Sequence, residues 1–100
     1  MSLFGEPVAA RQAEDWGMIW RCIDDGDFPS EVDRLASQLA SGPTTALALA
    51  KRAIAASHGN TLDRQLDLER DFQRAASAGD DYREGVRAFL DKRKPVFRGG

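Results

Sequence analysis

Apolar residues along this chain recur mainly at the three- and four-residue spacing of amphipathic α-helices. The pattern predicts five short helices, over about 8–16, from near 27 to the Gly-Pro break at 42–43, and over 44–58, 61–78 and 80–94. The stretch MIWRCI at 18–23 is either a single short strand that needs a partner from elsewhere or simply extended chain. We therefore predict an all-α fold with at most one short strand.

Residues with special backbone preferences mark the expected helix ends. Gly17 suits the left-handed conformation that often ends a helix, so it should close the first helix, and Gly59 should close the third. Asn60 is expected to cap the fourth helix, and Asp80 the last one. The basic run at 92–94 would then lie near the negative end of the last helix, where it complements the helix dipole.

Two of the helices have informative apolar faces. The second carries one stripe that we expect to be buried, formed by Val32, Leu35, Ala36, Leu39 and Ala40. The third is apolar almost all round at 46–50 and 53–56, which is more apolar surface than one small domain can cover. The third helix therefore indicates a neighbouring surface that this chain does not supply.

Composition and charge limit the classes of function. The 14 Lys and Arg residues against 16 Asp and Glu give a net charge of -2, which argues against general binding to nucleic acid or a membrane surface. The single Cys22 cannot form an internal disulfide, and no apolar run approaches the roughly 18 residues of a membrane span. No secretory leader opens the chain, although Met1–Leu3 resembles an expression leader or a cut point. A cytoplasmic location is expected.

Residues able to do chemistry are few and scattered. No nucleophile has a base at a recognisable spacing and no cluster suggests a metal, so we expect no catalytic residue and no metal site in this chain. His58, at a helix end, more often faces water or bonds a terminal carbonyl than binds a metal. Cys22 in its apolar run suits packing. The acids Asp24, Asp25 and Asp27 suit turns and caps, because calcium-loop spacing is missing.

Two further features allow more than one interpretation. Trp16 and Trp20 could stack on a ligand, but beside Met18 and Ile19 they are more typical of interface or core anchors. The basic run in DKRK at 91–94 could grip a phosphate, or it could be a solvated helix end. The residues alone leave both possibilities open.

Three stretches, in order, resemble the C-terminal part of the crotonase (enoyl-CoA hydratase/isomerase) family. They are GEPVAARQAEDWGMIWRCIDD at 5–25, LASGPTTALALAKRAI at 39–54, and LDRQLDLERDFQRAASAGDDYREGVRAFLDKRKPVF at 62–97. Within the family, the first and third are most similar to isomerases that rearrange a ring epoxide in bacterial phenylacetate degradation. The resemblance implies that residues 1–100 form a C-terminal helical domain and that the catalytic spiral core, upstream in the family, is absent.

The resemblance also implies a function for the whole enzyme. It would act on acyl-CoA thioesters, with coenzyme A as part of the substrate and no separate cofactor. The oxyanion-hole amides and the acid that moves protons belong to the upstream core, so this chain alone would be inert. Family helices of this region make subunit contacts in trimers or dimers of trimers, which implies self-association.

The last helix of family members contributes an aromatic residue and a lysine to the CoA nucleotide site, often on a neighbouring subunit's ligand. The matching positions are Phe89 and Lys92. They are about one turn apart on the predicted last helix and are therefore expected on a common face. The resemblance therefore implies that Phe89 and Lys92 bind CoA.

The alternative from another class is a stand-alone helical interaction module whose basic last helix docks an acidic partner protein. A small nucleic-acid-binding protein fits poorly, because the charge balance is acidic and no basic recognition face is visible.

Overall fold

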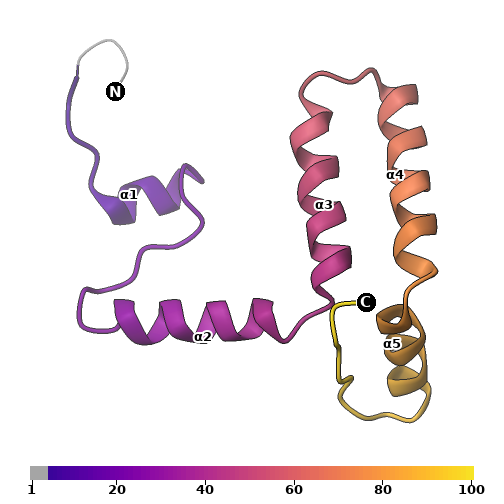
Figure 1. Cartoon of the computed structure of the whole chain (residues 1–100). Helices are drawn as coiled ribbons and strands as arrows, with labels where there is room; N and C mark the ends of the chain where they lie inside the picture. The colour runs from indigo at the N-terminus through magenta and orange to yellow at the C-terminus, as the bar shows by residue number, and fades with distance from the viewer. Residues whose placement is uncertain (1–4) are drawn as a thin grey trace. The chain divides into compact units, whose positions relative to one another are not determined.

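The computed structural model describes residues 5–100, and the chain divides into two compact units, 1–34 and 35–100. The expected leader at Met1–Leu3 lies outside the described residues. Five helices make up the secondary structure of the described part: α1 (Ala10–Asp15), α2 (Phe28–Ala40), α3 (Thr44–Ser57), α4 (Leu62–Ser77) and α5 (Asp80–Leu90) (Figure 1). No strand occurs within residues 5–100, and the segment 18–23 consists of bends and extended chain. The all-α prediction is confirmed.

The end of α1 organises the first unit. Gly17 adopts the left-handed conformation with φ of 70°. Its N–H donates to the carbonyl of Glu14 at 2.8 Å, and the N–H of Met18 donates to the carbonyl of Ala13, also at 2.8 Å. This pair of reversed hydrogen bonds is the Schellman motif, and the predicted role of Gly17 is confirmed.

The chain that continues from α1 is held by side-chain ion pairs at the surface. Arg11 pairs with Asp24 and Arg21 pairs with Glu31, each at 2.6 Å between nitrogen and oxygen. The carbonyl of Asp24 accepts the N–H groups of Asp27 and Phe28, so this acidic stretch forms a turn, as predicted. Exposed ion pairs of this kind each contribute little to stability.

The apolar stripe of α2 is not buried, which corrects the prediction. Within the chain Leu35 is half-buried, whereas Val32 and Leu39 are exposed. The main helix–helix contacts of the described residues are those of α3 with α4 and of α4 with α5, and α2 takes part in neither. Periodicity indicated an apolar face correctly, but it could not indicate whether this chain supplies the cover.

The second unit is built on the antiparallel pair α3 and α4, which lie side by side (Figure 1). The guanidinium of Arg52 on α3 lies 5.0 Å from the centre of the Phe72 ring on α4, a cation–π contact. The side-chain amide of Gln65 on α4 donates to the carbonyl of Ala53 on α3 at 3.1 Å. Leu47 and Ile54 of α3 nevertheless remain exposed. The neighbour that the sequence indicated for α3 is thus not supplied within this unit.

Two predicted helix caps are wrong, each by one residue. The hydroxyl of Thr61 accepts the N–H of Arg64, so Thr61 is the cap of α4, while the amide of Asn60 donates to the Gln65 side chain at 3.0 Å. The cap of α5 is Gly79, which has no side chain to accept a hydrogen bond, and Asp80 is already the first helical residue. Either neighbour of a helix start can act as a cap, and the local sequence did not distinguish them.

Candidate functional site

The basic run comes after α5 rather than forming its last turn, which corrects a prediction. The helix ends at Leu90 with Asp91 as its cap, and Lys92 has a left-handed backbone with φ of 53°. The N–H of Lys92 donates to the carbonyl of Phe89 at 3.2 Å, and that of Arg93 donates to the carbonyl of Ala88 at 3.0 Å. This is again a Schellman motif, but with lysine at the position where glycine is usual.

Phe89 and Lys92 therefore do not share a helical face, contrary to the prediction. They remain neighbours for another reason, because the Lys92 N–H donates directly to the Phe89 carbonyl. The prediction assumed an unbroken helix through both positions. The reversal at Lys92 is a backbone feature that side-chain periodicity does not show.

Both residues are accessible in this chain. Phe89 is 83% exposed, whereas Ala88, next to it on α5, is 1% exposed. Phe89 is thus outside the chain's own core. Lys92 is also exposed, and within residues 5–100 its ammonium forms no ion pair.

A carboxylate on α5 holds the chain beyond Lys92. The guanidinium of Arg93 donates to both carboxylate oxygens of Glu84, at 2.6 and 2.9 Å, and the N–H of Val96 donates to one of them at 2.9 Å. The hydrogen bonds from Arg93 and then from Val96 lower the pKa of Glu84 to about 2. Glu84 therefore carries its negative charge throughout the neutral range.

A second carboxylate, one turn earlier on α5, holds the end of the chain. Asp81 is 7% exposed and accepts the N–H groups of Arg98 and Gly99 at 2.7 and 2.9 Å. The N–H of Asp81 in turn donates to the carbonyl oxygen of Gly100 at 2.8 Å. A β-carbon at Gly79 would lie 2.9 Å from that oxygen, so glycine permits this close approach. The returning chain satisfies a donor at the start of α5 that the cap leaves open.

Sequence reasoning missed the roles of both Asp81 and Glu84. Their hydrogen-bond partners lie 9 to 18 residues further on, and three of these five bonds come from backbone N–H groups of an irregular segment. The spacing of Asp81 and Glu84, three residues apart and thus on one face of α5, was the available signal.

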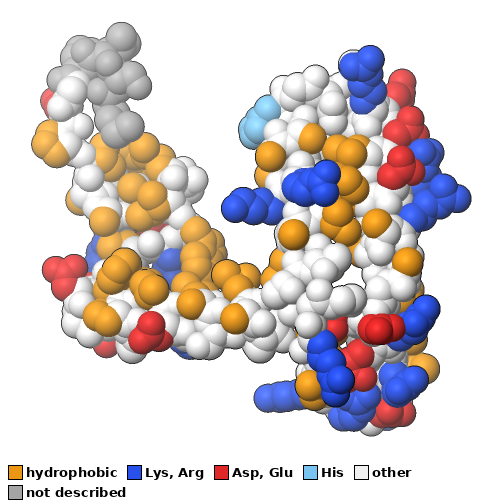
Figure 2. Space-filling view, viewed as in Figure 1, with side chains coloured by type: hydrophobic (Ala, Val, Ile, Leu, Met, Phe, Trp, Pro, Cys, Tyr) orange, Lys and Arg blue, Asp and Glu red, His pale blue; other side chains and the backbone are white. Residues whose placement is uncertain are grey.

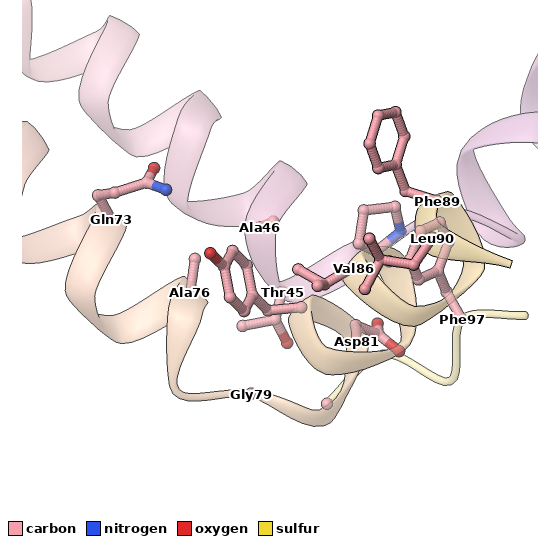
Figure 3. A pocket seen from close by; sticks show the side chains of 14 residues that line it. Thr45, Ala46, Gln73, Ala76, Gly79, Asp81, Val86, Phe89, Leu90 and Phe97 are labelled. Carbon is pink, nitrogen blue, oxygen red and sulfur yellow. The ribbon is translucent and has the colours of Figure 1, made fainter. Parts of the chain in front are cut away.

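An apolar hollow of about 450 Å³ lies beside these residues in the second unit. Its lining includes Val86, Phe89, Leu90 and Phe97, with Gln73 of α4. Figure 3 shows Phe89 at one end of the hollow and Gln73 at the other. The exposed ring of Phe89 is therefore part of a larger apolar surface.

The surface near α5 has a mixed charge. Figure 2 shows Lys and Arg side chains gathered around α5 and the segment after it, with acidic side chains between them. Several of these are paired, such as Arg83 with Asp80 at 2.9 Å. Lys94, like Lys92, forms no ion pair within residues 5–100. The ammonium groups of Lys92 and Lys94 can therefore bind an anion without first breaking a salt bridge.

The other residues considered from the sequence do not join this site. His58 is the exposed cap at the end of α3, Cys22 is half-buried, and Trp16 and Trp20 are exposed in the first unit. Among residues 5–100, no three His, Cys, Asp or Glu side chains lie close enough together to hold a metal ion. None of the described helices has the length and apolar character needed to cross a membrane.

Comparison with known proteins identifies the family. Residues 1–100 match the family described as enoyl-CoA hydratase/isomerase. The chain is 52% identical over 99 residues to 1,2-epoxyphenylacetyl-CoA isomerase from Escherichia coli K12, covering 99% of this chain and 38% of that protein. It is 36% identical over 104 residues to 2,3-dehydroadipyl-CoA hydratase from the same organism, covering 99% of this chain and 39% of that protein.

A solved structure agrees with the sequence comparison. The crystal structure of an enoyl-CoA hydratase from Polaromonas sp. JS666 superimposes with a TM-score of 0.87 at 37% identity, over 94% of this chain and 37% of that one. The chain thus spans well under half the length of these relatives. It belongs to the enoyl-CoA hydratase/isomerase family, the crotonase family that its sequence resembles.

Proposed function

We propose that this chain is the C-terminal helical part of an enzyme that acts on acyl-CoA thioesters, and that Phe89 and Lys92 form an edge of its site for the CoA nucleotide. The family match supports the class of substrate. The relatives' greater length supports a separate catalytic core in the whole protein. The two site residues come from the resemblance together with the local geometry of α5.

The observation that most supports a binding role for Lys92 is its left-handed backbone. A residue with a β-carbon costs about 1 kcal/mol or more in that conformation, which glycine would avoid. Non-glycine residues in such conformations concentrate at functional sites. A lysine here, exposed and without an ion pair in the described chain, is best explained by a use for its ammonium group.

The chemistry suits a nucleotide. An ammonium group near a multiply charged phosphate gains about 1 kcal/mol or more at a partly exposed position. The exposed face of Phe89 offers a platform on which a purine can stack, and such stacking tolerates different bases. Binding at this edge would hold the substrate without taking part in the reaction.

Replacing Lys92 with alanine in the whole enzyme tests the site. Loss of the ammonium should raise KM for acyl-CoA several-fold, with little change in kcat or melting temperature. The effect should disappear with an acyl-pantetheine substrate, which lacks the nucleotide. Lys51→Ala is the matched control, because Lys51 is an exposed lysine on α3. Unchanged affinity for CoA in Lys92→Ala at low salt would refute the assignment.

We further propose that the reaction is carried out by residues of the whole enzyme outside this chain. The oxyanion donors and the proton-transferring acid that the family chemistry requires have no counterpart among the groups described above. The isolated chain should show no turnover with saturating enoyl-CoA. Measurable hydration or isomerisation by the chain alone would contradict this part of the proposal.

The similarity to 1,2-epoxyphenylacetyl-CoA isomerase supports a proposal for the substrate, namely an aromatic ring epoxide carried on CoA in phenylacetate degradation. Comparing kcat/KM of the whole enzyme for epoxyphenylacetyl-CoA and for a straight-chain enoyl-CoA tests it. A clear preference for the straight-chain substrate would exclude the isomerase role and leave the family assignment intact.

Self-association of the chain is also proposed. Trp16, Trp20 and Ile54 are more than half exposed, and large apolar side chains left open in this way are typical of interfaces. Sedimentation at micromolar concentration should show a dimer or trimer. A monomer that binds no hydrophobic dye would count against it.

A further inference from the structure

We propose that Glu84 is a positioning residue for the CoA nucleotide, acting through Arg93 to hold Lys92 and Lys94 where they can meet its phosphates. This inference rests on the proposed function of Lys92 and goes beyond it. Glu84 itself is acidic and would not contact the ligand. Its role would be to fix the short segment that carries the two lysines.

Glu84 contacts the segment after α5 at two points, Arg93 and Val96. Its carboxylate receives the two-point hydrogen bond of the Arg93 guanidinium and also the N–H of Val96. Arg93 additionally donates to the carbonyl of Lys94 at 3.2 Å. One carboxylate thus fixes the chain directly after Lys92 and on both sides of Lys94. Two-point pairing of arginine with a carboxylate gives defined geometry as well as attraction.

The lysines themselves have no comparable restraint. Neither forms an ion pair within residues 5–100, and a lysine side chain is a flexible point charge. Their positions therefore depend on the backbone at 92–94. The helix end holds this backbone through the Phe89 carbonyl, which accepts the Lys92 N–H, and the Ala88 carbonyl, which accepts the Arg93 N–H. Glu84 holds the chain further on, at Arg93 and Val96.

A purely electrostatic effect of Glu84 and a positioning effect predict opposite changes in anion affinity when the charge of Glu84 is removed. Glu84 is a negative group close to a proposed phosphate site, so neutralising it should strengthen binding of an anion if charge alone matters. If Glu84 orders the lysines, neutralising it should weaken binding, because their freedom must then be lost on binding. The sign of the change separates the two explanations.

The test measures dissociation constants of the whole enzyme for coenzyme A and for pantetheine by calorimetry. Glu84→Gln should weaken coenzyme A binding several-fold and leave pantetheine binding unchanged. Asp80→Asn is the matched control, since Asp80 on the same helix also pairs with an arginine, Arg83, but does not touch the 93–96 segment. It should leave both constants unchanged.

A second variant keeps the inference testable if Glu84→Gln fails to fold. Arg93→Lys preserves the net charge but cannot make the two-point contact, and it should also weaken coenzyme A binding. In a background that carries both Lys92→Ala and Lys94→Ala, both substitutions should have a much smaller effect, because the groups that they position are gone.

Each outcome separates the inference from the function on which it rests. Unchanged coenzyme A binding in Lys92→Ala overturns the proposed site itself. If Lys92→Ala weakens binding but Glu84→Gln strengthens it or leaves it unchanged, only the positioning role is wrong. A loss of binding in Glu84→Gln that is equally large for pantetheine shows a general structural effect and overturns the positioning role. A loss that is fully additive with the double substitution Lys92→Ala and Lys94→Ala does so too.

Discussion

Helices α1 and α5 end in the same backbone motif but with different residues. Gly17 after α1 and Lys92 after α5 have φ of 70° and 53°, and each helix end has the same two reversed hydrogen bonds. Glycine takes this conformation without steric cost, and lysine does not. The backbone requirement is the same at both helix ends, but only the lysine has a steric cost. The proposed role of the Lys92 ammonium group in binding is one that glycine could not serve.

The two helix ends also differ in the path of the chain beyond them. After Gly17 the chain continues through bends toward α2, held by exposed ion pairs. After Lys92 the chain returns along α5, where Glu84 and Asp81 accept its N–H groups. Tertiary contacts at α5 thus offset the cost of a strained residue, while α1 relies on the glycine itself.

The largest effect should come from removing Asp81. Asp81→Ala leaves the N–H groups of Arg98 and Gly99 without their charged acceptor, which should lower the free energy of unfolding by about 2 kcal/mol. Hydrogen exchange at these two amides should become faster. Asp80→Ala, which removes a neighbouring acid whose hydrogen bond goes to Arg83 on the same helix, should change neither measurement appreciably. If hydrogen exchange at these two amides is unchanged in Asp81→Ala, Asp81 does not hold the returning chain, and the proposed difference between the ends of α1 and α5 is wrong.

A smaller effect is expected at the glycine of α1. Gly17→Ala should lower the free energy of unfolding by about 1 kcal/mol, because alanine is strained at positive φ. Tryptophan fluorescence during urea unfolding reports this region, since Trp16 and Trp20 are the chain's two tryptophans and flank the site. Gly26→Ala is the control, at a glycine without positive φ and with open space around it. Equal losses in both variants would show that φ is not the cause.

The converse change at α5 should stabilise the fold slightly. Lys92→Gly relieves the strain but adds freedom to the unfolded chain, for a net gain of about 0.5 kcal/mol in thermal or urea unfolding. Lys92→Ala keeps the strain and should be nearly neutral. Both variants should weaken coenzyme A binding equally. A Lys92→Gly enzyme that is more stable and still binds normally would mean that the lysine has no function in binding.

The smallest effect concerns pH. The pKa of Glu84, lowered to about 2 chiefly by the Arg93 hydrogen bond, lies well below 4.5, the ordinary value for a glutamate side chain. As pH falls, the unfolded chain therefore takes up the proton first, so the stabilising contribution of Glu84 is complete above about pH 5 and is lost as pH falls toward 2. Carboxyl chemical shifts in an NMR titration should show this low midpoint, and Glu84→Gln should remove it. A midpoint near 4.5 would mean that the Glu84–Arg93 contact does not persist in solution.

Much of the secondary structure could be predicted from local sequence. Gly17 and the Gly-Pro pair at 42–43 were recognised as breaks because their backbone preferences are intrinsic. The caps of α4 and α5 were misplaced because Asn60 and Thr61, or Gly79 and Asp80, are locally similar candidates. The conformational preferences of nearby residues locate a helix end to within one or two positions. Which residue is the cap depends on small differences in hydrogen bonding.

The apolar patterns identified faces but not their partners. The stripe with Val32 and Leu39 on α2 is real, yet the chain leaves it exposed. The apolar surface of α3 was correctly judged too large for one neighbour, and its exposed Ile54 agrees with that judgement. Periodicity reports which side of a helix is apolar, and only the fold shows what that side meets.

The sequence by itself determined the helical class, the main breaks and the family resemblance, and from that resemblance Phe89 and Lys92 are predicted as site residues. The tertiary structure alone decided that α5 stops before Lys92, and that Asp81 and Glu84 bind the returning chain. The reason is physical. Helical propensity and periodicity act between residues three or four apart, whereas these hydrogen bonds join residues 12 to 18 positions apart and form only once the chain has turned back on itself.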